Sequence, residues 1–277
     1  MSAANATPID RALALERILA IAREAAAGIA QVYAGQFDVE YKGKNDPVTI
    51  ADRTANTLIC DALIEAYPGM PIVAEESDAS SYAGFTSAKA VWFVDPLDGT
   101  REFVARNGEF AVMIGLAEEG RATLGVLFEP ATGRAFIGGE GLGAFEVMAD
   151  GSRREAHVSK TARLADAEML ASRSHRSEDL ERGVARFGVR AITPRGGAGV
   201  KAARIAMGES DIYWQPGRAG KRWDACAPEA IVRAAGGVYT DGYGDPIDYA
   251  TDVIENTRGI LAANAELHAE VLAKMPR

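Results

Sequence analysis

The stretch Trp92-Phe93-Val94-Asp95-Pro96-Leu97-Asp98-Gly99-Thr100 decides how this chain is expected to fold. Its first residues are apolar and favour a β-strand, and they lead to two aspartates three positions apart. The closing Gly-Thr can begin a helix, so both carboxylates, the carbonyl between them and the first N–H groups of that helix can face one point. Mg²⁺ prefers clustered oxygen ligands, and helix N-termini favour anions. The stretch therefore predicts a combined metal and phosphate site at the end of a strand.

The same Asp-Pro-x-Asp-Gly string is also ordinary turn chemistry, because Pro presets φ, Asp forms Asx-turns and Gly accepts a positive φ. Two other kinds of site are excluded. An EF-hand loop needs oxygen ligands alternating ahead of its glycine, whereas Val94 and Pro96 occupy those places. A Walker loop ends in Gly-Lys-Ser/Thr, whereas Lys201 is flanked by Val200 and Ala202. The metal interpretation therefore depends on further carboxylates elsewhere in the chain.

Two other segments supply such carboxylates. Glu75 follows a short apolar strand at 72–74, and Asp224 lies at the start of a predicted helix, with Pro228 still in its first turn. Each acid has a simpler interpretation, Glu75 as a solvated loop residue and Asp224 as a helix cap. If the acids converge, however, they repel one another unless a cation neutralises them. Their convergence would therefore indicate a metal.

The composition is that of a globular protein without affinity for nucleic acid. The chain has 277 residues, of which 48% are hydrophobic and 25% charged, and its formal charge of −9 opposes non-specific binding to DNA or RNA. Cys60 and Cys226 form neither a zinc set nor a disulfide framework, so we expect a reducing, cytoplasmic location. No apolar run approaches the ~20 residues of a membrane span, and the N-terminus lacks a signal-peptide pattern, so no membrane association is expected.

Hydrophobic periodicity predicts an α/β protein in two halves. A helix is expected to begin at Thr7-Pro8, with apolar residues at helical spacing as far as Val32. Turn signals at 119–120 and 130–133 predict an antiparallel meander, and after about residue 155 strands alternate with helices, which indicates a mixed or parallel sheet. We therefore expect an N-terminal α+β domain at 1–154 and a C-terminal α/β domain at 155–277. Strands are expected at 72–74, 91–94, 111–117, 122–128, 134–138, 144–147, 169–172, 212–214, 238–240 and 259–262, and further helices at 51–66, 177–187, 200–207, 225–235 and 265–275.

Several motifs together resemble those of the inositol-monophosphatase-like superfamily. The sequence from Asp95 to Thr100 is similar to one family signature, and Trp223-Asp224 followed by Gly236-Gly237 is similar to the other. The resemblance runs from Asp46 to Ala262 and implies a layered α-β-α-β-α sandwich of the inositol monophosphatase and fructose-1,6-bisphosphatase type. Three stretches resemble the 3′(2′),5′-bisphosphate nucleotidase branch most, namely Arg106-Asn107-Gly108-Glu109-Phe110, Ser172-Arg173-Ser174-His175 and Gly197-Ala198-Gly199-Val200-Lys201.

The resemblance implies a site with two or three Mg²⁺ ions. Glu75, Asp95 and the carbonyl of Leu97 would hold the first ion, and Asp95, Asp98 and Asp224 the second, in a two-metal arrangement that activates water and stabilises the leaving oxygen. Thr100 and Asp52 resemble the pair that orients and deprotonates that water, since a hydroxyl passes on a proton only to an acceptor. Asp52 could instead cap a helix, or do both.

Substrate-binding residues are also implied by the resemblance, and the amides of Gly99 and Thr100 are expected to bind the scissile phosphate. Alternatives exist for the nucleotide positions: a histidine here could be solvated, and the glycine loop could be a turn before a surface lysine. A basic cluster, Arg218, Lys221 and Arg222, is either a clamp for a second phosphate or a solvated run. The implied substrate-binding set is Glu75, Leu97, Asp98, Gly99, Thr100, Ser172, His175, Gly197, Lys201 and Asp224.

The resulting hypothesis is a Mg²⁺-dependent, lithium-sensitive phosphomonoesterase. It would remove the 3′-phosphate of adenosine 3′,5′-bisphosphate to give AMP and phosphate, and its sulfated form is a second expected substrate. An inositol monophosphatase or a sugar-bisphosphate phosphatase with the same metal core is the nearest alternative. A non-catalytic regulatory module is a further one. The expected partner is a small nucleotide, with neither nucleic acid nor membrane, for a chain that is a monomer or a homodimer.

Overall fold

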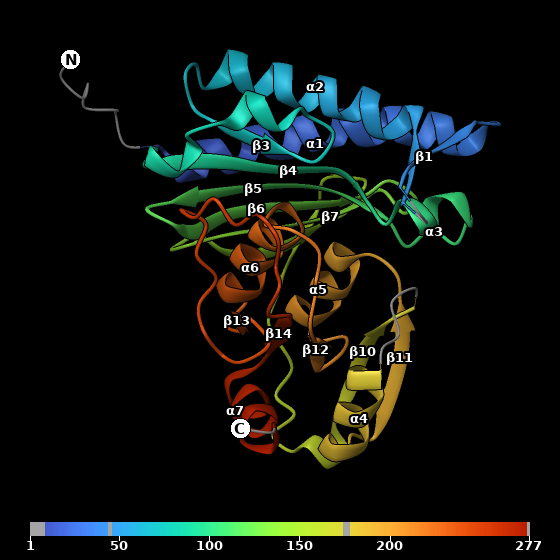
Figure 1. Cartoon of the computed structure of the whole chain (residues 1–277), viewed down its shortest axis with the longest axis vertical. Coiled ribbons are helices and arrows are strands. Elements are labelled where there is room, and N and C mark those ends of the chain that lie inside the picture. The colour runs from blue at the N-terminus through green and yellow to red at the C-terminus, as the bar shows by residue number, and fades with distance from the viewer. Residues whose placement is uncertain (1–8, 44–45, 174–177, 276–277) are drawn as a thin grey trace.

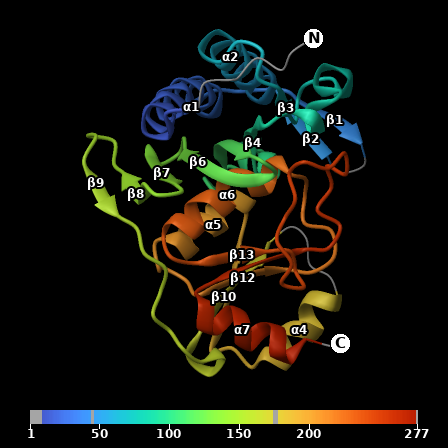
Figure 2. The ribbon, with the colours of Figure 1, turned by 90° about the vertical axis from the view of Figure 1, so that its left-hand side faces the viewer.

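The computed structural model describes residues 9–43, 46–173 and 178–275, which form alternating layers of helices and sheets. Long helices cover the outer face of a first sheet, further helices lie between that sheet and a second one, and the last helices cover the far side of the second sheet (Figures 1 and 2). This arrangement confirms the layered α-β-α-β-α sandwich that the sequence motifs implied. No helix in these described ranges is long and apolar enough to cross a lipid bilayer.

The outer helical layer consists of α1 (Arg11–Ala34) and α2 (Ile50–Ala66). The side chain of Asp10 caps α1 by accepting the N–H of Leu13 at 3.1 Å, so the predicted start at Thr7-Pro8 is wrong; Thr7 and Pro8 themselves lie outside the described residues. An aspartate next to the first buried turn provides the acceptor that the helix terminus needs. The hairpin of β1 (Val39–Gly43) and β2 (Asp46–Thr49) connects the two helices.

The first sheet has seven strands in the order β3-β4-β5-β6-β7-β8-β9. β3 is parallel to β4, and each later strand is antiparallel to the one before it, which confirms the meander and adds β9, a strand that the sequence did not indicate. The strands span Ile72–Ala74, Ala90–Asp98, Ala111–Glu118, Arg121–Glu129, Arg134–Gly139, Gly143–Val147 and Arg153–Glu155. Short 3₁₀ turns lie at Ala79–Tyr82, Phe85–Ser87 and Leu164–Asp166.

β4 continues further than predicted, because the aspartates belong to the strand and do not lie in a turn beyond it. Asp95 pairs with Met113 and Asp98 with Ala111, and an irregularity between the two pairs accommodates the intervening residues. Bulges of this kind redirect side chains next to active sites. α3 (Thr100–Val104) then begins directly after Gly99, as the closing Gly-Thr predicted.

The middle layer contains α5 (Ala198–Ala206) and α6 (Trp223–Ala234). α6 packs directly on the first sheet over a row of three glycines in register across β5, β6 and β7, namely Gly115, Gly125 and Gly138. A Cβ atom on Gly125 would lie 2.3 Å from the carbonyl oxygen of Ala227, so only glycine permits this approach. The row of glycines therefore determines how close α6 lies to the strand that carries the aspartates.

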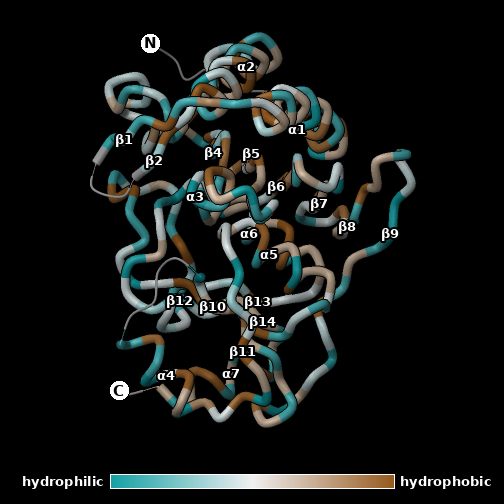
Figure 3. Tube along the Cα trace, turned by 90° about the vertical axis from the view of Figure 1, so that its right-hand side faces the viewer, coloured by the Kyte–Doolittle hydropathy of each residue, from teal (hydrophilic) through white to brown (hydrophobic). Residues whose placement is uncertain are grey.

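The second sheet has five strands in the order β11-β10-β12-β14-β13 and is mixed, as predicted. α4 (Glu178–Phe187) and α7 (Ala265–Lys274) form the last layer. Hydrophobic residues concentrate in the middle layer at α5, whereas the outer segment at β9 is hydrophilic (Figure 3). The sequence did not indicate β11. The strands span Glu168–Ser172, Ala191–Arg195, Ile212–Gln215, Val238–Thr240 and Ile260–Ala263.

The predicted division between residues 154 and 155 falls within β9, the last strand of the first sheet, one residue before that strand ends. One hydrophobic cluster nevertheless joins both parts around the middle layer, where Phe93 and Leu127 of the first sheet share a core with Ala202 and Ile231. Two independent domains therefore stay a prediction.

Candidate active site

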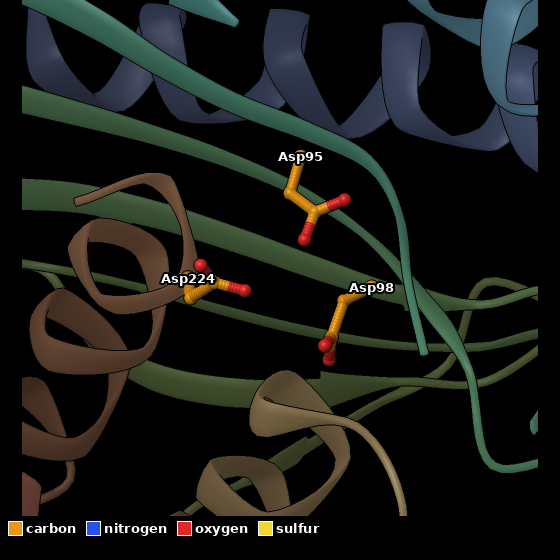
Figure 4. A group of neighbouring side chains, drawn as sticks. All are labelled: Asp95, Asp98 and Asp224. Atoms are coloured by element: carbon orange, nitrogen blue, oxygen red, sulfur yellow. The ribbon is translucent and has the colours of Figure 1, made fainter. Parts of the chain in front are cut away.

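Three aspartates from the two halves of the chain meet between β4 and α6. Carboxylate oxygens of Asp95, Asp98 and Asp224 all lie within 4.8 Å of one another (Figure 4). The side chains of Asp95 and Asp98 are buried, and that of Asp224 is partly buried. Three of the four acids that the sequence motifs singled out are thus brought together by the fold.

The electrostatics of this group fit a hard divalent cation. Burial raises the pKa of Asp95 well above its usual range, and the charges of Glu75, Asp224 and Asp98 raise it further. Burial likewise raises the pKa of Asp224, with Glu75 and Asp98 adding to the effect. Buried carboxylates without a counter-charge are costly, and oxygen donors are the ligands that Mg²⁺ selects. These residues fit a metal centre, and they would hold Mg²⁺ through their carboxylates.

Glu75 lines the same cavity but does not belong to the group within 4.8 Å. Its amide donates to the carbonyl of Val94 at 3.1 Å, which fixes it at the end of β3 beside β4. Burial raises the pKa of its carboxyl to about 7, and the ammonium of Lys42, 3.7 Å away, opposes the shift. Its role as a metal ligand stays a prediction, as does that of the Leu97 carbonyl.

Asp52 and Thr100 are in direct contact. The hydroxyl of Thr100 lies 2.9 Å from Asp52 Oδ1 and 3.1 Å from the carbonyl oxygen of Leu97. The other carboxylate oxygen of Asp52 accepts the amide and the hydroxyl of Thr49, at 2.8 and 2.7 Å, and forms a capping box at the start of α2. Both interpretations of Asp52, as a cap and as the partner of Thr100, hold in the geometry. Burial raises its pKa, although the bonds from Thr49 and Thr100 lower it.

Asp98 also connects the first sheet to α5. Its two oxygens accept the amides of Ala198 and Gly199 at 2.9 and 2.7 Å. Gly197 has a φ of +58°, and a Cβ there would lie 2.9 Å from Asp98 Oδ2, so the glycine is required for this approach. Lys201 is buried, donates to the carbonyl of Gly197 and lies 5.0 Å from the ring centroid of Tyr213.

The start of α6 agrees with the prediction for Asp224 but not with the prediction for Pro228. Asp224 lies in the first turn and accepts the amide of Lys221 at 2.6 Å, but Arg222 is the N-cap. Pro228 lies beyond the first turn, inside the helix, so its placement in the first turn is wrong. Because proline lacks an N–H, the carbonyl of Asp224 receives no bond from that position.

A cavity of about 330 Å³ joins these groups. Arg218 and Lys221 of the predicted basic cluster line it, whereas Arg222 donates to Asn256 and does not. His175 lies outside the described residues. Tyr213 and Gln215 also line the cavity but were not predicted, because the sequence of this short buried strand resembles that of any other core strand. The predicted residues that line it are Glu75, Asp95, Leu97, Asp98, Gly99, Thr100, Ser172, Gly197, Lys201 and Asp224.

A layered α/β fold with a buried acidic centre and a hydroxyl–carboxylate pair nearby is the architecture of a metal-dependent phosphatase. The chain belongs to the inositol monophosphatase family, whose model matches residues 14–277, and this confirms the resemblance found in the motifs. It is therefore a phosphatase of that family.

Curated relatives and solved structures agree with this placement. The chain is 35% identical over 240 residues to the 3′(2′),5′-bisphosphate nucleotidase CysQ of Escherichia coli, covering 85% of this chain and 93% of that one. It is 31% identical to human 3′(2′),5′-bisphosphate nucleotidase 1, covering 81% of each chain. The extragenic suppressor protein SuhB of Bartonella henselae has a similar structure, with a TM-score of 0.81 and 28% identity over 95% of this chain and 98% of that one.

Proposed function

We propose that this chain is a Mg²⁺-dependent 3′(2′),5′-bisphosphate nucleotidase that hydrolyses the 3′-phosphate of adenosine 3′,5′-bisphosphate to give AMP and phosphate. The observation that carries the proposal is the arrangement of the three aspartates and Thr100 around one cavity. The names of the CysQ and human relatives support the substrate class. The sulfated form of the same nucleotide is a second proposed substrate, and the cytoplasm is the proposed location.

The residues of the chain divide the chemistry between them. Asp95, Asp98 and Asp224 would hold Mg²⁺, which when bound lowers the pKa of water and neutralises charge on the phosphate. Thr100 orients the attacking water and accepts its proton at Oγ1, while the hydroxyl proton moves to Asp52 Oδ1, 2.9 Å away. The raised pKa of Asp52 makes its carboxylate a better acceptor for that proton.

A phosphate-release screen tests the proposal. Purified protein is assayed with adenosine 3′,5′-bisphosphate, its sulfated form, inositol 1-phosphate and fructose 1,6-bisphosphate, each with and without Mg²⁺ and Li⁺. We expect the highest kcat/KM with the adenosine bisphosphate, no turnover without Mg²⁺ and inhibition by Li⁺. A preference for the inositol or sugar ester would overturn the substrate assignment. Absence of turnover with every ester in saturating Mg²⁺ would favour a regulatory module.

A further inference from the structure

Glu109 is a buried carboxylate next to the cavity to which the sequence motifs assigned no role. It lies between α3 and β5, in the half of the chain that carries Asp98. Its side chain nevertheless contacts the other half: Oε2 accepts the amide of Gly196 at 2.6 Å, and Oε1 accepts Arg173 and Arg195 at 2.8 and 3.0 Å. Burial raises the pKa of this carboxyl, but the Gly196 amide and the two guanidinium groups outweigh that effect and lower it. Glu109 is therefore an ionised anchor.

The two arginines lie at the ends of neighbouring parallel strands. Ser172 of β10 is in register with Arg195 of β11, and the amide of Arg173 donates to the carbonyl of Arg195 at 3.0 Å. Figure 1 shows the two strands side by side. Ligands of α/β sheets bind beyond the carboxyl ends of parallel strands, which is where this pair lies.

The charges of this cluster do not balance. In the described part of the chain, Glu109 is the one carboxylate that forms an ion pair with Arg173 or Arg195, so two guanidinium groups share a single negative charge. Their side chains remain 45% and 40% exposed. A guanidinium has five N–H donors, so each keeps donors that Glu109 does not occupy. The pair therefore offers a net positive charge and a planar array of donors to an anion.

The cluster adjoins the cavity in both sequence and space. Ser172 and Gly196, each adjacent in sequence to one of the arginines, line the cavity. The carbonyl oxygen of Glu109 would lie 2.8 Å from a Cβ on Gly99 and 3.1 Å from one on Gly197, so it packs between the metal-bearing loop and the glycine loop. A substrate whose scissile phosphate lies at the aspartates can thus extend toward the arginines.

We propose that Arg173 and Arg195 bind the phosphate of the substrate that is not cleaved, and that Glu109 is the positioning residue that holds the pair. The proposal rests on the proposed nucleotidase function and adds the residues that distinguish a bisphosphate from a monophosphate. Arginine suits this task because its planar fork matches a phosphate bidentately. Glu109 supplies the fixed geometry, since it also anchors Gly196 on the same strand end.

The test compares two substrates that differ in one phosphate. KM and kcat of the full chain are measured for adenosine 3′,5′-bisphosphate and for adenosine 3′-monophosphate, in wild type, Arg195→Gln, Arg173→Gln and Glu109→Gln. We expect the KM for the bisphosphate to rise about tenfold or more in each variant, with a much smaller change in kcat, because a charge-assisted bond is lost. The KM for the monophosphate should change far less. Equal increases for both substrates, or none for either, would overturn the proposal.

A second buried ion pair, away from the cavity, serves as the control for loss of structure. Glu129 is also buried and accepts Arg204 of α5 at 2.7 Å, joining the same two halves without lining the cavity. Glu129→Gln should leave the ratio of the two KM values as in wild type. If Glu109→Gln folds poorly, the same KM measurements are made on Arg195→Lys. Lysine keeps the charge but loses the planar fork, so the KM for the bisphosphate should still rise more than the KM for the monophosphate. Glu109→Asp should restore part of the bisphosphate preference.

A binding measurement separates this proposal from the nucleotidase function. AMP carries only the phosphate that is not cleaved, so its calorimetric Kd reports the arginine pair without turnover. We expect Arg195→Gln to weaken AMP binding about tenfold or more. If wild type hydrolyses neither nucleotide while AMP binding depends on Arg195, the anion site stands and the nucleotidase function fails. If AMP binds wild type and Arg195→Gln equally, the anion site fails whatever the enzyme hydrolyses.

Discussion

Asp52 shows how one side chain serves the fold and the site together. One of its oxygens closes the capping box with Thr49, and the other faces the hydroxyl of Thr100, which comes from 48 residues further along the chain. The capping box holds the carboxylate of Asp52 at the start of α2, so its other oxygen stays directed at the hydroxyl of Thr100. The hydrogen bonds that cap α2 therefore also position Asp52, the proposed proton acceptor.

Replacing Thr100 with valine tests this pair. Thr100→Val keeps the shape and removes the hydroxyl that orients the water, so kcat should fall roughly a hundredfold or more, while calorimetric Mg²⁺ affinity changes little. Thr123→Val is the control, because Thr123 is buried and hydrogen-bonded on β6 but does not line the cavity. A Thr100→Val enzyme with normal kcat would remove Thr100 from the mechanism.

Removing one of the crowded aspartates should stabilise the metal-free protein. In Asp95→Asn the remaining amide oxygen can still accept the N–H of Leu97, but one of the three neighbouring carboxylates is gone. The free energy of unfolding of the metal-free variant at pH 8 should therefore exceed that of metal-free wild type by about 1 kcal/mol or more, and the variant should unfold at a higher temperature. Addition of Mg²⁺ should stabilise wild type and not the variant, as measured by thermal unfolding in EDTA and in Mg²⁺. Equal Mg²⁺ stabilisation of both proteins would disprove the metal assignment.

At the scale of elements, the packing of α6 on the sheet decides where Asp224 lies. The glycines of β5, β6 and β7 let the helix approach so closely that its backbone contacts the strands directly. A helix normally packs on a sheet through side chains of both, which keeps the backbones further apart. Here the close approach brings the first turn of α6 to the aspartates of β4.

A single added methyl group tests this packing. Gly125→Ala places a Cβ 2.3 Å from the carbonyl oxygen of Ala227, so α6 must shift, and the free energy of unfolding should fall by about 3 kcal/mol. Calorimetric Mg²⁺ affinity should fall as well, because Asp224 moves with the helix. Gly28→Ala in α1 is the matched control: its Cβ would meet nothing within 4 Å, and alanine should stabilise the helix by about 0.5–1 kcal/mol. Unchanged Mg²⁺ affinity in Gly125→Ala would show that the site tolerates displacement of α6.

At the scale of the whole molecule, a buried acid remote from the aspartates links stability to pH. Glu229 accepts the hydroxyl of Tyr249 at 2.8 Å, and burial raises its pKa to about 7, although Tyr249 and Arg233 oppose the shift. Its folded pKa lies above the unfolded value of 4.5, so the folded protein binds the proton more tightly. The stability that this group contributes is fully present below pH 4.5 and is lost as the pH rises to about 7.

Replacing Glu229 with glutamine should remove this dependence. Glu229→Gln mimics the protonated acid, so wild type should lose about 3 kcal/mol more stability than the variant between pH 4 and pH 8. Urea unfolding of both proteins at the two pH values, in EDTA, measures the difference, because the other titrating groups cancel. Parallel pH profiles would show that Glu229 titrates normally in the folded chain.

The sequence alone was enough to predict most helices and strands, because these depend mainly on interactions between residues close together in the chain. Alternating apolar residues and turn signals identified the meander, and helical spacing identified most helices, because these patterns depend on neighbours along the chain. The motifs also named the acids of the proposed metal centre before the fold placed Asp95, Asp98 and Asp224 together. The errors lay at the ends of elements. The side chain of Asp10 and not Thr7 caps α1, α6 begins at Trp223 so that Pro228 lies beyond its first turn, and the pairing of Asp98 with Ala111 extends β4.

Tertiary structure alone decided which distant groups meet. Asp98 bonds the start of α5 across 100 residues, and Glu109 bonds Gly196 across 87, while nothing in the spacing of Glu109 indicates an arginine partner. The close approach of α6 likewise needed three glycines that are in register only once β5, β6 and β7 pair. Such contacts follow from the path of the whole chain through two sheets, since carboxylates gather in a buried place only where packing of the surrounding core forces them together.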